Sequence, residues 1–424
     1  MALSPDPASP TPASPDPAPS PLPEQPDLRH LKDQARDLVR IGAATTLSAA
    51  RLAVAREYGF ASWPRLKAHV ESLNEAGRLK AAIDANDIEQ VRELMTRSPE
   101  LHRAPLGYGK NGPLTWVAEC RIPWEAPGET RLAMARWMLE HGSDVHQGGD
   151  GPLMRAALYD LRIPMLELLL EHGADVNARW GGRYPIICAP CETLQPGALR
   201  RLIEHGADPM VRSAEYGTPL SMVIGTYSRD AAGRRACLEV FAELGCTLPD
   251  TPVMELARGR LDLLDQRLSR EPDLLKRRFR LEEIYPPEVG LDPQDGLHLT
   301  PLAGATLLHL AVEYCDLEAA AWLLDHGADP NLRAATDADG FGGHTPLYHT
   351  VITLGPRTDA LTRLLLHHGA DPNLRASLRK QLRHMGDPDK ERLHEFHNVT
   401  ATEFAHQFQE PAWVNHPALA LLEG

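Results

Sequence analysis

The sequence predicts an all-α solenoid, in which similar helix-turn-helix units stack along one continuous core. Three observations lead to this fold class: a short phrase recurs along the chain, its copies follow one another at about 33 residues, and the composition favours packed helices. Hydrophobic residues make up 43% of the 424 residues, but aromatic residues only 5%. A core of small and aliphatic side chains suits helices better than a β-sandwich.

The recurring phrase is His-Gly-Ala-Asp, followed by Pro or Val and then Asn, at the end of an expected helix. Its fullest copies lie at 172–177, 326–331 and 368–373, and weaker copies lie at 141–145, 205–209 and 244–246. Their glycines are spaced by 31, 33, 39, 82 and 42 residues. A period near 33 with one double interval is typical of a repeat array that carries insertions. We expect about nine repeats, beginning near residues 78, 112, 150, 183, 217, 251, 303, 342 and 396.

Three regions follow one another along the chain. Residues 1–26 hold ten prolines and no Lys or Arg, which predicts a disordered tail rich in Pro, Ala and Ser. Residues 27–76 are expected to form a small helical cap, in which Asp27 begins the first helix and Gly59 ends the second. The array takes residues 77–424, with insertions near 282–302 and 377–396. In a solenoid such insertions emerge as loops on one face, either on the binding face or as plain surface loops.

Pieces of a second phrase, Thr-Pro-Leu-His-x-Ala, open the expected first helices at 218–220, 345–347 and 306–311. On these two phrases the chain resembles the ankyrin repeat family, over roughly 80% of its length. The resemblance implies helix pairs joined by short hairpin fingers, and a function in binding other proteins. Within it, Thr345 is expected to cap a helix that has Pro346 in its first turn. The stretch 55–66 is similar to the helical lead-in of bacterial ankyrin proteins, which implies a bacterial origin.

Charge and cysteine usage limit the choice of partner and compartment. The net charge of −14 argues against nucleic-acid binding, which needs clustered Lys and Arg. The basic stretch 276–280 is either a local binding patch or, as we favour, a solvated helix end. The longest uncharged helical stretch, 41–50, is too short to cross a bilayer. Six cysteines without a disulfide framework indicate a reducing compartment, so we expect a cytoplasmic protein without a membrane partner.

Catalytic motifs are missing from the sequence. It has no Gly-rich phosphate loop, nucleophile elbow or HExxH pattern in a suitable context, so we predict no enzyme, no cofactor and no small-molecule substrate. Cys188 and Cys191 have CxxC spacing, and a metal or thiol site there is one alternative function. Because no further ligand pair accompanies them, we interpret both as packing residues of a first helix. The histidines before the recurring glycines are interpreted as helix-end residues, and no metal site is predicted.

A repeat solenoid offers a long inner surface formed by finger tips and first helices. Aromatic and Arg side chains are the usual anchors on such a surface. We therefore predict a non-catalytic protein-binding scaffold or regulator with an unidentified protein partner, and keep a nucleic-acid-associated role as an alternative. The candidate partner-binding residues are Trp116, Trp180, Arg183, Tyr184, Arg212, Tyr216, Tyr227, Tyr314, Phe341, His344 and His349.

Overall fold

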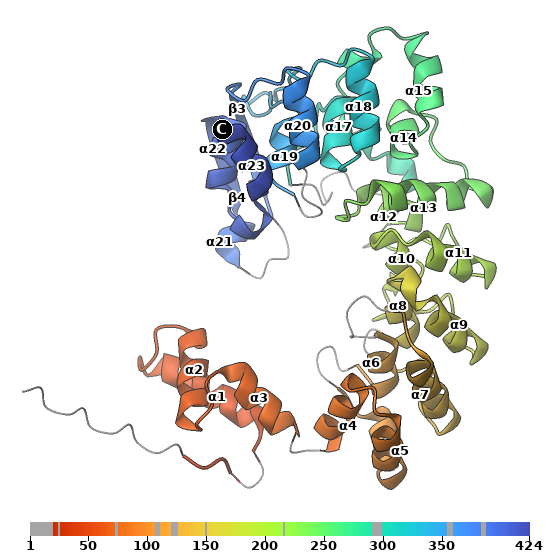
Figure 1. The fold of residues 1–424 in the computed structure, drawn as a ribbon, viewed down its shortest axis with the longest axis vertical. Helices are drawn as coiled ribbons and strands as arrows, with labels where there is room; N and C mark the ends of the chain where they lie inside the picture. Colours follow the sequence, from red (N-terminus) through yellow and green to blue (C-terminus); the bar gives the residue numbers. More distant parts are fainter. Residues whose placement is uncertain are drawn as a thin grey trace, which may run out of the picture. The chain divides into compact units, whose positions relative to one another are not determined.

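The structure is a computed structural model. It describes residues 20–23, 26–72, 75–106, 111–119, 126–148, 151–214, 217–290, 299–353, 359–382 and 387–424. Most of the expected proline-rich tail, 1–26, and the candidate residue Tyr216 lie outside these described residues. The contacts within the chain divide it into two compact units, Met1–Tyr108 and Gly109–Gly424 (Figure 1).

The first unit is helical. Its helices are α1 (Leu28–Arg40), α2 (Leu47–Glu57), α3 (Trp63–Ser72), α4 (Glu75–Asp84) and α5 (Ile88–Arg97). The first three enclose a small aliphatic core of Leu31, Ala35, Ala50, Val54, Ala55, Leu66 and Val70. Burial of these side chains holds the three short helices together, since isolated helices of this length are marginal in water.

Local signals set the ends of these helices. The Asp27 side chain accepts a hydrogen bond from the backbone N–H of Arg29, so it begins α1 as expected. Gly59 follows α2 with a φ of 80°, a conformation that favours glycine. The pair α4–α5 belongs to the first unit together with the first three helices, although the array was expected to begin at residue 77.

The second unit consists of helix pairs that follow one another in a row (Figure 1). The first helices of the pairs are α6 (Pro113–Glu119), α8 (Pro152–Ala157), α10 (Cys188–Glu192), α12 (Pro219–Gly225), α14 (Pro252–Ala257), α17 (Leu307–Glu313), α19 (Tyr348–Val351) and α22 (Ala401–Gln407). The second helices are α7 (Glu129–Glu140), α9 (Ile163–Glu171), α11 (Pro196–Glu204), α13 (Ala231–Glu243), α15 (Leu261–Leu268), α18 (Leu317–Asp325), α20 (Asp359–His367) and α23 (His416–Glu423).

Neighbouring pairs stack in register. Helix α8 contacts α6 and α10, and α17 contacts α14 and α19, so first helices lie against first helices. In the same way α9 contacts α7 and α11, and α20 contacts α18 and α23. Each pair therefore buries its apolar side between two neighbours, which is the all-α repeat fold that the sequence predicts.

The recurring His-Gly phrase ends the second helices. In four copies the histidine Nδ1 donates a hydrogen bond to the carbonyl four residues earlier, over 2.7–2.8 Å; these are His141, His172, His205 and His326. The glycine that follows has a positive φ, for example 82° at Gly173 and 91° at Gly327. The histidine thus satisfies a carbonyl at the helix end, and the glycine turns the chain.

Threonine begins several first helices. Thr218, Thr306 and Thr400 each form a capping box with the residue three positions later. The expectation for Thr345 and Pro346 is wrong, because α19 begins only at Tyr348 and has no side-chain cap. Thr345 instead offers its backbone carbonyl to the Tyr348 N–H.

One finger of the array is a short β-hairpin, with two residues in each strand and three residues, 181–183, in the loop. Strand β1 (Arg179–Trp180) pairs antiparallel with β2 (Tyr184–Pro185), with Trp180 opposite Tyr184. Gly181 and Gly182, between the strands, have φ values of 57° and 73°. Two successive positive φ angles match the twist of a tight hairpin, and only glycine takes them without strain.

The first insertion packs against the array in its described part. It contains the short helix α16 (Leu281–Ile284), and the side chains of Ile284 and Tyr285 are buried. The Thr218 hydroxyl donates a hydrogen bond to the Val289 carbonyl over 2.6 Å. The insertion is therefore tied to the start of α12 rather than being a free surface loop.

The second insertion forms a long hairpin. Strand β3 (Ala376–Gln381) pairs antiparallel with β4 (Leu393–Val399), and the short helix α21 (Pro388–Glu391) lies between them. Leu378 and Phe396 face each other across the strands and are buried, and Phe396 stacks edge-on against Phe404 of α22. The hairpin is thus an enlarged finger anchored on the last helix pair.

Candidate functional site

A groove of about 300 Å³ lies on the second unit, between residues 154 and 227. It is bordered by α8 and the turn after it, the hairpin β1–β2, the end of α10 and the turn after α12. Four of its nine lining residues are aromatic in a chain with few aromatic residues. The lining consists of Met154, Arg155, Leu158, Tyr159, Trp180, Tyr184, Glu192, Thr193 and Tyr227.

The hairpin supplies the groove with a pair of rings. The Trp180 and Tyr184 rings meet edge to face, with their centroids 6.1 Å apart. Trp180 is 39% exposed, whereas Tyr184 is buried and its hydroxyl donates a 2.8 Å hydrogen bond to Glu192 Oε2. Tyr227, on the other side, is also 39% exposed. The groove therefore combines a buried ring, Tyr184, which is held by a hydrogen bond, with two rings, Trp180 and Tyr227, that are partly exposed to solvent.

Hydrogen bonds hold the ends of α8 and α10 in place. The Thr193 hydroxyl donates to the Leu158 carbonyl over 2.7 Å, and the Thr226 hydroxyl donates to the Glu192 carbonyl. Each bond joins the end of one first helix to that of the next repeat. The lining side chains are thus positioned by the stacking of repeats, which leaves the groove preformed.

Burial changes the acidity of the tyrosines. Burial first, and then the nearby Glu192 carboxylate, raises the pKa of Tyr184 and of Tyr227 well above the ordinary value. Both phenols stay protonated at neutral pH. They serve the groove as apolar surfaces with a polar edge, and neither has the lowered pKa that a catalytic base would need.

Six of the nine lining residues were not predicted from the sequence: Met154, Arg155, Leu158, Tyr159, Glu192 and Thr193. A signal for one of them exists, since Tyr159, Thr193 and Tyr227 are separated by 34 residues each and occupy one repeat position, just after a first helix. Because Tyr227 was chosen as a candidate, the residue at the same position two repeats earlier, Tyr159, could have been chosen as well.

The structure brings together three of the candidate residues, namely Trp180, Tyr184 and Tyr227. Arg183 and Arg212 are exposed near the same fingers but do not line the groove. The Arg179 guanidinium joins the two fingers by donating hydrogen bonds to the carbonyls of Arg183 and Arg212.

Phe341 lies away from the groove, beside the enlarged hairpin. It is half-buried, and the Arg379 guanidinium lies 4.9 Å from its ring centroid. Arg379 also pairs with Asp337 and Asp339, at 2.6 and 3.0 Å. The stretch that contains both aspartates therefore serves as a docking point for the hairpin.

Four other candidates are buried and do not belong to an exposed surface: Trp116, Tyr314, His344 and His349, with exposures between 0% and 5%. Trp116 lies inside α6, whose described side chains are all buried. Trp116, Tyr314 and His349 were expected on the exposed side of first helices and His344 on a finger tip, but all four side chains are buried within the array.

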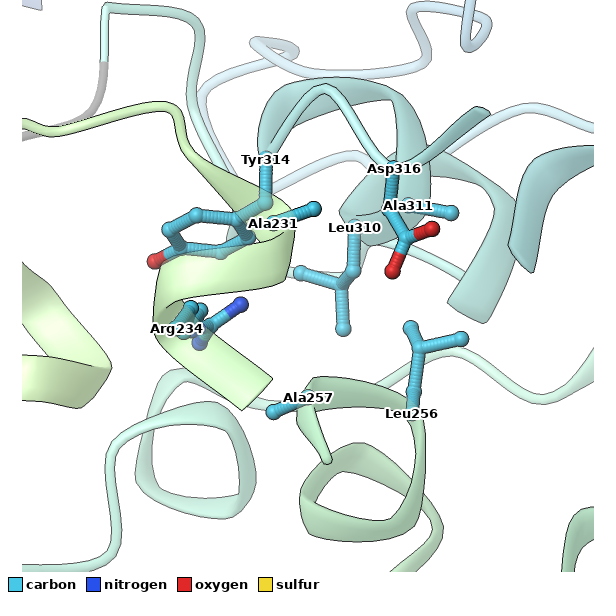
Figure 2. Close-up of a pocket in the computed structure, with 8 residues that line it drawn as sticks. All are labelled: Ala231, Arg234, Leu256, Ala257, Leu310, Ala311, Tyr314 and Asp316. Atoms are coloured by element: carbon cyan, nitrogen blue, oxygen red, sulfur yellow. The ribbon is translucent and has the colours of Figure 1, made fainter. Parts of the chain in front are cut away.

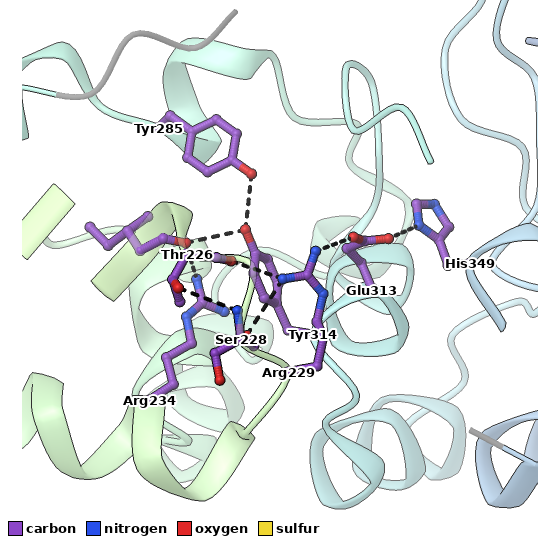
Figure 3. Close-up of polar contacts among 9 residues, drawn as sticks. Thr226, Ser228, Arg229, Arg234, Tyr285, Glu313, Tyr314 and His349 are labelled. Atoms are coloured by element: carbon purple, nitrogen blue, oxygen red, sulfur yellow. Dashed lines mark hydrogen bonds and ion pairs between the residues drawn. The ribbon is translucent and has the colours of Figure 1, made fainter. Parts of the chain in front are cut away.

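Tyr314 and His349 belong to a buried polar network instead (Figure 3). Arg229 Nη2 donates to Glu313 Oε1 over 2.7 Å, and His349 Nδ1 donates to Glu313 Oε2 over 2.7 Å. The Arg229 and Glu313 side chains are only 2% and 3% exposed. The network links the start of α13, the end of α17 and α19, and so fastens helix pairs that are far apart in the sequence.

The second part of this network surrounds Tyr314. Its hydroxyl lies 2.9 Å from that of Tyr285 and donates to the Ile224 carbonyl, while the Arg234 guanidinium stacks 3.7 Å from its ring centroid. A small cavity beside Arg234, Tyr314 and Asp316 measures about 10 Å³ (Figure 2). That volume holds about one water molecule, so this place is a packing defect and not a ligand site.

Cys188 and Cys191 both lie on α10 with no exposed surface. Burial, with Glu192 nearby, raises the pKa of Cys188 to about 12, and burial raises that of Cys191 as well. Redox and metal-binding thiols need the opposite shift. No group of three or more His, Cys, Asp or Glu side chains within the described ranges is arranged to hold a metal ion.

The basic stretch 276–280 is balanced by carboxylates. Arg277 pairs with Glu283 at 2.6 Å, and Lys276 pairs with Asp273 at 3.4 Å. Arg278 donates to the Arg333 carbonyl. These contacts fit the solvated helix end favoured above better than a patch that neutralises phosphates.

Comparison with known families gives two matches. A model of three ankyrin repeats matches residues 283–376, and a single ankyrin repeat matches residues 148–180. The second match covers α8, α9 and β1, and so includes one side of the groove. A comparison with curated proteins finds no match. Among the helices that the structure describes, none is long and apolar enough to cross a membrane.

Proposed function

Because the chain carries ankyrin repeats, which generally act as protein-interaction modules, we propose that it is a non-catalytic scaffold or regulator that binds a protein partner in the aromatic groove. The observation that carries this proposal is the concentration of aromatic side chains in a preformed groove. Large aromatic anchors dominate the binding free energy of most protein interfaces. Trp180 and Tyr227 are the residues with ring surface open to a partner.

The chemistry of the lining supports binding and not catalysis. The Tyr184 hydroxyl is committed to Glu192, and the Thr193 hydroxyl is committed to a backbone carbonyl. Tyr184 and Tyr227 both lie beside the Glu192 carboxylate, but burial raises the pKa of each phenol, which is the opposite of what an activated nucleophile needs. A cytoplasmic location is part of the proposal, since the cysteines of the described chain are free thiols.

The test is partner capture with matched tryptophan variants. The full chain is tagged and used to capture proteins from its own cells, as the wild type, as Trp180→Ala with Tyr227→Ala, and as Trp322→Ala. Trp322 is also partly exposed, but it lies on the second helix α18, stacked on His326.

We expect the groove variant to lose a partner that the wild type and Trp322→Ala both retain. Circular dichroism spectra must coincide for all three proteins, so that loss of fold is excluded. Retention of every partner by the groove variant would show that the groove is not the anchor.

A further inference from the structure

The polar side chains of the groove offer a ligand more hydrogen-bond acceptors than donors. The Tyr184 hydroxyl donates its hydrogen bond to Glu192, and the Thr193 hydroxyl donates to the Leu158 carbonyl. A hydroxyl that donates still has lone pairs, and the Glu192 carboxylate, with about four lone-pair sites, keeps about two after its hydrogen bonds with Tyr184 and Tyr227. The polar edge formed by these three side chains is therefore mainly an acceptor edge, which fits a ligand that brings its own N–H groups.

The rings point to the same kind of ligand. The face of an aromatic ring carries the negative end of its quadrupole and attracts cations. One ring of the lining already does so, since the Arg162 guanidinium lies 4.8 Å from the centroid of the Tyr159 ring. Trp180 and Tyr227 offer further ring surface, each being 39% exposed.

The formal charges of the groove's lining side chains do not exclude the binding of a cation. The lining contains one positive and one negative side chain, Arg155 and Glu192, whose formal charges cancel. Arg162 already occupies the Tyr159 ring, so the exposed rings of Trp180 and Tyr227 are the surface that attracts a further cation. The whole chain, at −14, attracts basic segments over longer distances.

We propose that the groove binds an arginine or lysine side chain from a basic segment of the partner protein, between the open rings and the Glu192 carboxylate. This inference rests on the proposed function and specifies the chemistry of the partner. The aliphatic stem of the side chain packs on Trp180 and Tyr227, and its charged end reaches Glu192.

A random peptide library displayed on phage tests the proposal without a known partner. The library is selected on the full wild-type chain, and binders are then measured on Glu192→Gln and Trp180→Ala. Two matched controls make the same chemical changes outside the groove, Glu171→Gln on α9 and Trp322→Ala on α18.

We expect peptides that share one Arg or Lys, with affinity that falls about tenfold or more on both groove variants and stays unchanged on both controls. In each selected peptide, replacing that Arg by citrulline, or that Lys by norleucine, should cause a similar loss on the wild-type chain. This arm needs no protein variant, so it holds even if Glu192→Gln fails to fold.

Two results overturn the inference in different ways. Peptides that depend on Trp180 but carry neutral or acidic anchors, or that bind Glu192→Gln unchanged, would refute the cationic ligand and leave the protein-binding proposal intact. A selection that yields no peptide dependent on Trp180 would remove the groove as a binding site, and with it the proposed function as stated.

Discussion

Glu313→Gln is expected to be among the most destabilising single changes in this protein. Glu313 forms a 2.7 Å ion pair with Arg229, both side chains are almost fully buried, and its other oxygen accepts from His349. The variant leaves the Arg229 guanidinium charged in the interior without a counterion. Removing one partner of a buried pair in this way costs about 3–5 kcal/mol of unfolding free energy.

The assay is urea unfolding of the full chain, followed by circular dichroism. A first control is Glu204→Gln, which breaks a pair with Arg201 whose side chains are 43% and 46% exposed. Exposed pairs contribute about 0–1 kcal/mol, so this control should unfold nearly as the wild type does.

A second control removes both buried charges, as Arg229→Met with Glu313→Leu. Apolar replacement of a buried pair is often neutral or stabilising, so the double variant should be clearly more stable than Glu313→Gln. The reasoning fails if Glu313→Gln costs less than about 1 kcal/mol, or if the double variant is as unstable as the single one.

Three further predictions concern two titratable side chains and one turn of the array. Burial lowers the pKa of His309 from 6.5 to about 3, so the unfolded state binds this proton at a higher pH than the folded state does. The free energy of unfolding should therefore decline from pH 6.5 toward pH 3, by up to about 1.4 kcal/mol per pH unit. Urea midpoints at pH 7 and pH 5 test this, and the decline should be less steep in His309→Gln. Cys188 should react with a disulfide reagent at pH 8 far more slowly in the native chain than in urea, because only about one thiol in ten thousand is ionised at a pKa of about 12. Fast labelling of the native chain would support a thiol or metal-binding role for Cys188. Cys315 has a φ of 56° in the turn between α17 and α18, and Asn86 has a similar φ of 59° in the equivalent turn between α4 and α5. Because Asn tolerates this conformation better than Cys, Cys315→Asn should raise the unfolding free energy by about 0.5–1 kcal/mol. An unchanged or lower value would mean that the turn is not strained.

The fold was predictable because its signals are local and repeated. The His-Gly phrase carries a side-chain hydrogen bond and a left-handed glycine, and both act within one helix turn. The same holds for Thr218 and Thr306, which cap the helices that they begin. Thr345 is followed by Pro and Leu as Thr218 is, yet its helix starts only at Tyr348, so the phrase alone does not fix where a helix begins.

The elements that escaped prediction depend on distant contacts. The charged stretch 377–396 resembles a surface loop in sequence, but Leu378 and Phe396 pair across it and form a hairpin. His349 follows a Thr-Pro-Leu phrase and was expected to face outward, whereas Glu313, 36 residues earlier, binds it in the interior. A sequence pattern of one repeat does not record which side chains the neighbouring repeats cover.

The groove shows the same limit. Trp180, Tyr184 and Tyr227 were predicted as anchors from their residue type and their place on fingers and first helices. Glu192, which accepts the Tyr184 hydrogen bond, lies at a helix end that carried no signal by itself. Only the stacking of successive repeats brings these side chains to one place.

The most direct test of the central claim, that a protein partner is held in the aromatic groove, is site-specific photocrosslinking. A benzophenone amino acid replaces Trp180 in one protein and Trp322 in another, and crosslinked products are identified by mass spectrometry after irradiation in cells. The account predicts a discrete crosslinked protein from position 180, joined through a segment that contains Arg or Lys, and no such product from position 322. Crosslinks to that protein from position 322 alone, or from both positions equally, would contradict it.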